Sequence, residues 1–545
     1  MPYPQMVEYN EAVQNPAHAF LDPELKKGSV RENNLGLPMV LSGGFALTYT
    51  VTTPNRKCAV RCFHREVSHI EEKYTSIAQK LNALRSEYFV HFDFQKQGII
   101  VKENRFPIVR MDWVEGDPLG VWLDKNYENP RVLQKARADF TSLASFLERE
   151  GIAHGDIQNG NVMLSRGSVK LIDYDGMYVP GMSLGSGSET GHKHFQHPHR
   201  RSSDYGPKMD RFSFIALDIS LHATIENKDL YRRFREGGET IVFKANDFID
   251  PQNSKIFKVL EANARLRDEA QRFAAICDAD IASVPSLSDF HAGRNVPIRK
   301  SKTAIAPVVR ALVYVSPYPV LDAGDFDAAE RRVGDRVELV GEIVEVKVGT
   351  GQHGKGRGRP YIFINFGPWK GRIVKVTIWS EGLSNLKEQP SSEWIGRWIS
   401  VNGLVDPPYS SKRYGYTHLS ITVEREGQIQ PLDEKEARFR LASIGKPAPQ
   451  GGRATAGTTN GSSNTPITPP RPSPPQSAPK LPKSGNQDIV ARFKKLAEPP
   501  PPSAPFPGPP QRGSTPVSTR PSPGIPKWIW WAAIGIIVLL YVLSR

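Results

Sequence analysis

Three polar residues in the first third of the chain have the types and the order that phosphoryl transfer requires. Asp156, Asn161 and Asp173 lie within residues 151–176, which read GIAHGDIQNGNVMLSRGSVKLIDYDG. One carboxylate can accept the proton of an attacking hydroxyl, while an amide and a second carboxylate can hold Mg²⁺ against nucleotide phosphates. The apolar runs after Asn161 and before Asp173 predict two short buried strands that would position these side chains.

This spacing resembles the HxDxxxxN and DFG motifs of protein kinases. The resemblance implies that Asp156 accepts the proton of the substrate hydroxyl, and that Asn161 and Asp173 bind Mg²⁺. It also implies ATP as the phosphoryl donor and a protein Ser or Thr hydroxyl as the acceptor.

The stretch departs from the kinase pattern at three places. Gly155 stands where kinases have the Arg of HRD, and Gln158 replaces a Lys that commonly contacts the γ-phosphate. Tyr174 and Asp175 occupy the Phe and Gly positions of DFG, so the motif reads DYDG. These departures leave a pseudokinase scaffold as an alternative interpretation.

Upstream residues fit the nucleotide-binding lobe that the resemblance implies. Gly43, Gly44 and Phe45 lie in a predicted glycine-rich hairpin, whose backbone N–H groups can approach phosphates closely. Ala59 and Arg61 lie in the alternating segment CAVRCF, which matches the VAIK strand of kinases. Arg61 then occupies the position of the phosphate-binding Lys.

A helix is predicted from Arg65 to Leu84 and corresponds to the kinase C-helix. It should supply the carboxylate partner of Arg61. The sequence offers Glu71 or Glu72, with Glu66 as a third choice.

The segment from Phe106 to Glu115 resembles the strand and hinge between kinase lobes. Backbone groups from Asp112 to Val114 would bind the adenine edge. Asp210, in DRFSFIAL, resembles the Asp that anchors the catalytic loop from below. The predicted fold class is therefore α+β, with a bilobal kinase-like domain over residues 10–290.

Residues 291–330 are predicted to be a connector, and residues 331–430 a β-rich domain. Five predicted strands with a short helical insert resemble an OB-fold barrel. A basic glycine-rich loop and the aromatic residues Phe363, Phe366, Trp369 and Trp379 are typical of single-stranded nucleic-acid binding. The alternative is that these aromatic residues form the core of the barrel.

The remaining chain predicts a tether and an anchor. Residues 446–526 are Pro-, Ser- and Thr-rich, which predicts a disordered linker. Residues 527–545 are predicted to be a C-terminal transmembrane anchor because Trp528 to Leu543 contains no charge. Arg512, Arg520 and Lys527 precede that segment, so the N-terminal domains are expected in the cytoplasm.

The charge balance and the cysteine content indicate which partners and which kinds of site to expect. Lys and Arg number 71 against 57 Asp and Glu, and this excess favours anionic partners. Only three cysteines occur, without CxxC spacing, which argues against a disulfide framework or a thiolate zinc site.

Taken together, the motifs, the resemblance to kinases and the C-terminal segment predict a membrane-anchored serine/threonine protein kinase that transfers the ATP γ-phosphate to an unknown protein substrate. A nucleic-acid-binding protein with a regulatory kinase-like domain is the third interpretation.

Overall fold

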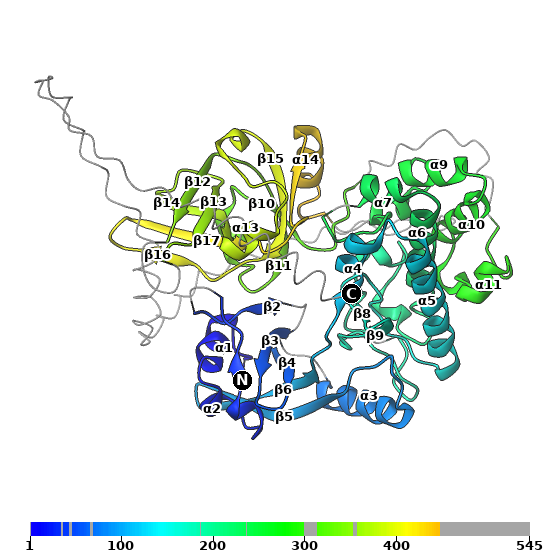
Figure 1. The fold of residues 1–545 in the computed structure, drawn as a ribbon, viewed down its shortest axis with the longest axis horizontal. Coiled ribbons are helices and arrows are strands. Elements are labelled where there is room, and N and C mark those ends of the chain that lie inside the picture. The colour runs from blue at the N-terminus through cyan, green and yellow to red at the C-terminus, as the bar shows by residue number, and fades with distance from the viewer. Residues whose placement is uncertain are drawn as a thin grey trace, which may run out of the picture. The chain divides into compact units, whose positions relative to one another are not determined.

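The computed structural model describes residues 2–446, apart from 34–35, 43–45, 66–68, 186, 236, 299–312 and 352–356. Three regions of mixed α/β structure follow one another along the chain (Figure 1). An antiparallel sheet comes first, a mostly helical region second and a β-rich region third.

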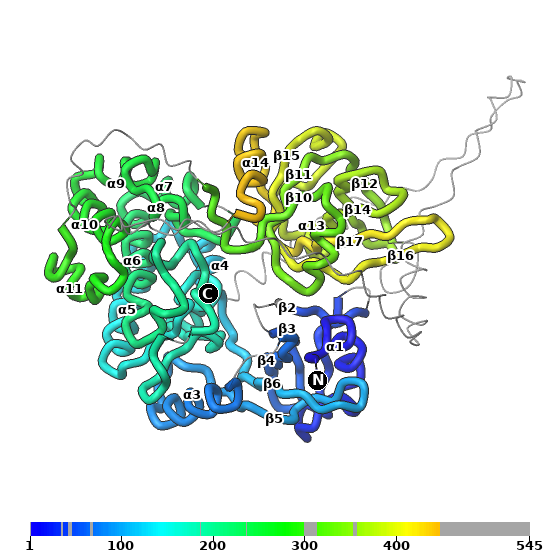
Figure 2. The backbone as a smooth tube through the Cα atoms, turned by 180° about the vertical axis from the view of Figure 1, so that it is seen from behind, coloured from blue at the N-terminus to red at the C-terminus, as the bar shows by residue number. Residues whose placement is uncertain are grey.

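The N-terminal sheet has the strand order β1-β3-β4-β6-β5, with β2 paired to β3. Its strands are β1 (Ser29–Val30), β2 (Val40–Ser42), β3 (Ala46–Thr52), β4 (Lys57–Phe63), β5 (Phe92–Val101) and β6 (Asn104–Asp112). Helices α1 (Met6–Val13), α2 (Pro16–Ala19) and α3 (Ile70–Leu84) pack against β5 (Figures 1 and 2).

Alternation along β3 and β4 divides the residues between the two faces of the sheet. Val60 and Cys62 share a buried cluster with Tyr9 of α1. Phe63 instead belongs to the main core of the helical region. Arg61 is therefore on the face that carries Phe63, opposite to the α1 cluster.

The helical region is built around α5 and α6, which lie side by side (Figure 1). Its helices are α4 (Leu119–Asn126), α5 (Pro130–Glu150), α6 (Arg211–Glu226), α7 (Lys228–Phe234), α8 (Ala245–Ile249), α9 (Lys255–Ala262), α10 (Arg267–Asp278) and α11 (Leu287–His291). A small sheet joins β7 (Asp117–Pro118), β8 (Val162–Ser165) and β9 (Ser168–Leu171). The hairpin of β8 and β9 confirms the two short buried strands predicted around the polar motif.

Local sequence signals determine the ends of α5. The Asn129 side chain accepts a hydrogen bond from the N–H of Val132 at 3.4 Å, and Pro130 occupies the first turn. Gly151 ends the helix with φ +64°, a left-handed conformation that favours glycine. The chain leaves α5 at this glycine and enters the polar motif directly.

The C-terminal region contains two sheets, ordered β10-β11-β15-β18 and β12-β13-β14-β17-β16. The strands are β10 (Val320–Asp322), β11 (Arg336–Glu342), β12 (Glu345–Thr350), β13 (Pro360–Asn365), β14 (Gly371–Trp379), β15 (Trp398–Leu404), β16 (Tyr409–Ser411), β17 (Tyr416–Thr422) and β18 (Ile429–Leu432). The helices are α12 (Phe326–Glu330), α13 (Ser380–Asn385) and α14 (Glu434–Leu441). Both sheets contribute side chains to one apolar core.

The closed barrel predicted from the sequence is not found in the described residues. The segment read as one strand, Arg336 to Val348, is divided between β11 and β12. The N–H of Ile343 bonds to the carbonyl of Arg397, whereas the N–H of Val344 bonds to that of Asn365. Two successive residues thus bond to different sheets. The isolated bridge between Val405 and Ile421 also joins these two sheets.

Two further expectations have a structural outcome. The predicted helix start at Arg65 is wrong, because α3 begins at Ile70, after His69 adopts φ +56°. Among the described residues, no helix combines the length and apolar character needed to cross a membrane. The predicted linker, residues 446–526, and the predicted anchor, residues 527–545, lie outside the described residues except for Lys446.

Candidate active site

Asp210 at the start of α6 anchors the loop that carries the polar motif. Its two carboxylate oxygens accept hydrogen bonds from the backbone N–H groups of His154 and Gly155, the latter at 2.8 Å. Burial raises the pKa of Asp210, while the charge of His154 and the two backbone donors oppose that rise. The anchoring role predicted for Asp210 is confirmed by these two bonds.

Gly155 replaces the expected Arg because the backbone is tightly packed at this position. Its φ is +84°, and a Cβ there would lie 2.2 Å from the carbonyl oxygen of Gly176. A side chain therefore cannot fit without moving the loop away from the segment around Gly176.

Three donors hold the carboxylate of Asp156, which is partly exposed. Its Oδ1 accepts from the N–H of His192 at 2.7 Å. Its Oδ2 accepts from Asn161 Nδ2 at 2.8 Å and from Gln158 Nε2 at 3.3 Å. Gln158 thus supports Asp156, a role that the sequence did not indicate.

Asp173 follows β9 in a left-handed conformation with φ +68°. Backbone strain of this kind at a non-glycine residue is common at functional sites. The neighbouring Tyr174 is 1% exposed, and its hydroxyl accepts from the N–H of Val90 at 2.7 Å and donates to the carbonyl of Leu171 at 3.0 Å. The buried Tyr174 fixes the segment that carries Asp173.

Arg61 joins the N-terminal sheet to this segment. Its Nη1 is 2.8 Å from Asp173 Oδ1, and its Nη2 is 2.5 Å from Asp175 Oδ2. Burial raises the pKa of Asp173, but the charge and hydrogen bonds of Arg61 outweigh burial and lower it overall. For Asp175, burial has the largest effect and raises the pKa; the charge of Arg61 opposes this rise, and the charge of Asp173 adds to it.

The prediction that Glu71 or Glu72 of α3 pairs with Arg61 is wrong. Glu71 pairs with Lys96 at 2.7 Å, and Glu72 pairs with His69 at 3.1 Å. Both glutamates are exposed, since the inward face of α3 is formed by Tyr74, Ile77 and Leu81. Glu66 lies outside the described residues.

The predicted nucleotide-contacting residues are only partly described. Gly43, Gly44 and Phe45 lie outside the described residues, while Ala59 is partly buried on the same strand as Arg61. The N–H of Asp112 bonds to the carbonyl of His91 at 3.0 Å, so it is not free for an adenine edge. The side chain of Asp112 accepts from Arg56 Nη1 at 2.8 Å.

Val114 remains as the hinge position to which the adenine prediction applies. Strand β6 ends at Asp112, and the N–H of Trp113 bonds to the carbonyl of Lys57 at 3.1 Å. Val114 lies beyond these sheet bonds and packs partly against the main core.

The donor atoms fit a hard divalent cation and phosphate oxygens. Asn161 uses its Nδ2 on Asp156, which leaves its amide oxygen as the ligand atom, and Asp173 supplies carboxylate oxygen. Arg61 Nε is buried without a hydrogen-bond partner in the described part of the chain, and a phosphate oxygen would satisfy it. The described residues contain no group of three or more His, Cys, Asp or Glu that could hold a metal.

Glu189 is a fourth carboxyl near the site, and no sequence motif indicated it. Burial, and then the charges of Asp175, Asp173 and Asp156, raise its pKa to about 8. Since an unfolded Glu titrates near 4.5, the folded protein binds more protons between these pH values, and stability falls as pH rises through this window.

We expect Glu189→Gln to flatten that pH dependence. Urea unfolding of wild type and variant at pH 5 and pH 8.5 measures it, and the variant should gain stability relative to wild type only at the higher pH. Gln389→Glu, at a surface site in the C-terminal region, controls for a general charge effect. Equal slopes with pH for wild type and Glu189→Gln would contradict this assignment.

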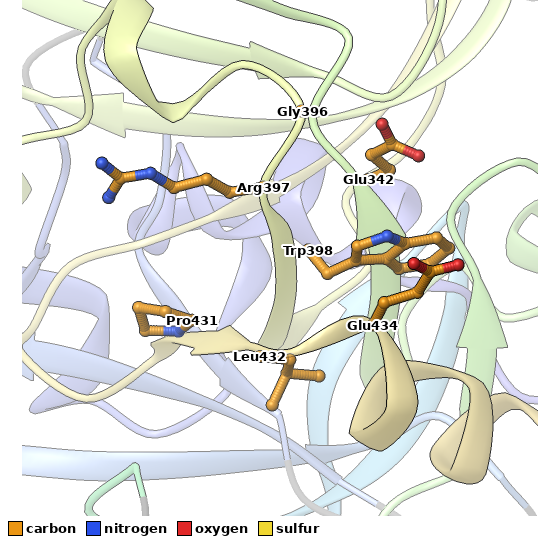
Figure 3. A pocket seen from close by; sticks show the side chains of 7 residues that line it. All are labelled: Glu342, Gly396, Arg397, Trp398, Pro431, Leu432 and Glu434. Carbon is orange, nitrogen blue, oxygen red and sulfur yellow. The ribbon is translucent and has the colours of Figure 1, made fainter.

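One cavity of about 410 Å³ lies elsewhere, in the C-terminal region (Figure 3). It is lined by residues of β11, β15, β18 and α14, including Trp398 and Glu434, and by Arg397 directly before β15. None of the candidate catalytic residues lines it.

One curated protein that is similar to part of this chain is a protein kinase. A stretch of 130 residues is 28% identical to the serine/threonine-protein kinase PksC of Streptomyces coelicolor, covering 22% of this chain and 23% of PksC. The chain thus matches about a quarter of that relative's length. The kinase PK-1 of the Cydia pomonella granulovirus is similar in structure, with a TM-score of 0.33 and 15% identity, over 49% of this chain and 93% of that one. No protein-family model matches the chain.

Proposed function

We propose that this protein transfers the γ-phosphate of ATP to a Ser or Thr hydroxyl of another protein. The observation that carries the proposal is the arrangement of two carboxylates, one amide and one buried guanidinium group. Asp156 is held by Asn161, and Asp173 is held by Arg61. The similarity to a serine/threonine kinase supports the same chemistry.

Each residue then has a defined task. Asp156 orients the substrate hydroxyl and takes its proton, and its bonds to His192 and Asn161 fix its position. Asn161 and Asp173 would hold Mg²⁺, which neutralises charge on the transferred phosphoryl group. Arg61 would bind phosphate oxygens with its planar donor set.

Transfer of label from γ-labelled ATP by the full-length chain tests the proposal. Wild type should label a Ser/Thr-containing acceptor in the presence of Mg²⁺, and EDTA should stop the transfer. A pseudokinase scaffold would show no transfer under any of these conditions, and that result would refute the proposed activity.

We also propose that residues 527–545 attach the chain to a membrane with its N-terminal domains in the cytoplasm. The support is the uncharged segment Trp528 to Leu543. In cell fractionation, full-length protein should stay with membranes after carbonate extraction, while a chain ending at Pro526 should be released. Equal release of both proteins would contradict the anchor.

A second candidate function, binding of single-stranded nucleic acid, is supported by the outer face of β13 and β14. Ile362 and Ile364 point into the core, so the alternating Tyr361 and Phe363 lie on the opposite face. Phe363 therefore lies outside the core, whereas Phe366 packs against it, as the alternative predicts for these aromatic residues.

Rings on that face are arranged with a cation among them. Tyr361 and Phe363 stack with centroids 4.6 Å apart, and Trp379 meets Phe363 edge to face at 5.9 Å. Lys375 Nζ lies 3.9 Å from the Phe363 centroid. Bases stack on such rings, while the ammonium group attracts the phosphates.

The charge of Lys375 makes this candidate testable by pH. Burial, with a smaller effect of Lys347, lowers the pKa of Lys375 to about 8. The ammonium group is lost as pH rises through that value, so affinity for oligo(dT) should fall between pH 7 and 9. Fluorescence anisotropy at low salt measures this fall.

Two variants sharpen the nucleic-acid test. Phe363→Ala should weaken oligo(dT) binding at every pH, and Lys375→Gln should abolish the pH dependence. Lys387→Gln removes an exposed cation away from these strands and should bind as wild type does. Absence of binding at low salt would remove this candidate.

A further inference from the structure

Arg61 is a buried cation and therefore depends on its anionic partners. Its side chain is 8% exposed, and removing one partner of a buried ion pair leaves an uncompensated charge. The two partners differ in exposure: the Asp175 side chain is 9% exposed, whereas that of Asp173 is 31% exposed. Asp175 is thus the enclosed partner, and Asp173 is the partner that also faces outward.

Helix α3 contacts this pair without contributing a carboxylate. The Tyr74 hydroxyl donates to Asp175 Oδ1, and Lys73 Nζ donates to the main-chain oxygen of Asp175. Tyr74 itself is fixed by neighbouring rings, with Phe94 stacked on it at 5.6 Å. Both hydrogen bonds from α3 thus end at Asp175, and neither involves a glutamate of the helix.

We propose that Asp175 is the positioning residue for Arg61, in place of a glutamate from α3. This inference rests on the proposed function for its consequence, although the pairing itself can be measured without a nucleotide. Asp175 holds one arm of the guanidinium group, and the other arm contacts Asp173. The Nε has no hydrogen-bond partner among the described residues and would be available to a phosphate oxygen.

The location of Asp175 has a mechanistic consequence. It is two residues from Asp173, so the segment that supplies a cation ligand also supplies the partner of the phosphate-binding Arg. Without the Asp175 charge, Arg61 would pair more strongly with Asp173, and it would compete there with Mg²⁺.

A double-mutant cycle on the unfolding of the full-length chain, without nucleotide, tests the pairing. Arg61→Gln and Asp175→Asn should each lower the free energy of unfolding. The double variant should lower it by clearly less than the sum of the two single losses. Arg61→Gln combined with Glu72→Gln is the matched control and should be additive. Additivity of the Arg61 and Asp175 substitutions would overturn the proposal.

Binding of a fluorescent ATP analogue over a Mg²⁺ titration tests the positioning role. Asp175→Asn should raise the half-saturating Mg²⁺ concentration about tenfold or more, while Asp175→Glu should restore most of the affinity because it keeps the charge. Glu71→Gln and Glu72→Gln should behave as wild type. If Asp175→Asn responds to Mg²⁺ as wild type does, or only the α3 variants shift, the proposal is wrong.

These outcomes separate the inference from the proposed function. Nucleotide binding that depends on Asp175, without phosphoryl transfer by wild type, would refute the kinase activity and retain the positioning role. If wild type transfers phosphate and Asp175→Asn transfers it equally well, the kinase activity is retained and the positioning role is refuted.

Discussion

Replacement of Asp156 by Asn is expected to reduce phosphoryl transfer by about 10²–10⁴-fold, the range typical of a lost general base. The amide keeps nearly the same shape, and its oxygen can still accept the N–H of His192. It cannot take up a proton from the substrate hydroxyl. Initial rates with γ-labelled ATP measure the loss, and the affinity for ATP should change little.

Asp139→Asn provides the matched control for this substitution. Asp139 lies on α5 and pairs with Lys135 at 2.5 Å, away from the polar motif. Its variant should transfer phosphate at the wild-type rate. A rate for Asp156→Asn within a few-fold of wild type would show that Asp156 is not the proton acceptor.

Gly155→Ala should combine a loss of stability with a loss of activity. The added Cβ would meet the Gly176 carbonyl oxygen at 2.2 Å, and the backbone has φ +84°. Overpacking and a left-handed alanine together should cost about 2–4 kcal/mol of unfolding free energy. Since Asp156 is the next residue, the displaced loop should also lower the transfer rate.

Gly167→Ala separates the steric clash from the backbone effect. Gly167 also has a positive φ, +82°, but a Cβ there meets nothing within 4 Å. This variant should lose only about 1 kcal/mol and keep its activity. Thermal or urea unfolding and initial rates of both variants measure the difference, and equal losses would contradict the packing explanation for Gly155.

Motif spacing predicted the local frame of the site because it reflects short-range structure. The order of His154, Asp156 and Asn161 depends on a single turn between α5 and β8, and the anchor at Asp210 begins the next long helix. The loop follows from nearby residues, whereas the Asp210 anchor, 55 residues from Gly155, was predicted from the resemblance to kinases.

The partner of Arg61 could not be predicted in this way. Glu71 and Glu72 were chosen by position along a helix, yet the helix turns Tyr74 toward the site and both glutamates toward solvent. Asp175 occupies a position where the family pattern has glycine, so the comparison assigned it no task. Which residue neutralises a buried guanidinium is decided by tertiary packing.

The β-rich region shows a similar limit. Its strands were predicted from β-branched and aromatic residues, but the division of residues 336–348 between two sheets depends on the partners of Ile343 and Val344. Hydrophobic pattern alone does not reveal a change of partner within one uninterrupted strand-like segment.

The most direct measurement of the central claim is transfer of the γ-phosphate by the full-length protein with Mg²⁺, compared with its Asp173→Asn variant. Under the proposed function Asp173 binds the cation, and its Oδ1 lies 2.8 Å from Arg61 Nη1. We predict labelling of a protein Ser or Thr by wild type, and at least about 10²-fold less by the variant. Equal labelling by both proteins, or none by wild type with any acceptor, would contradict the account.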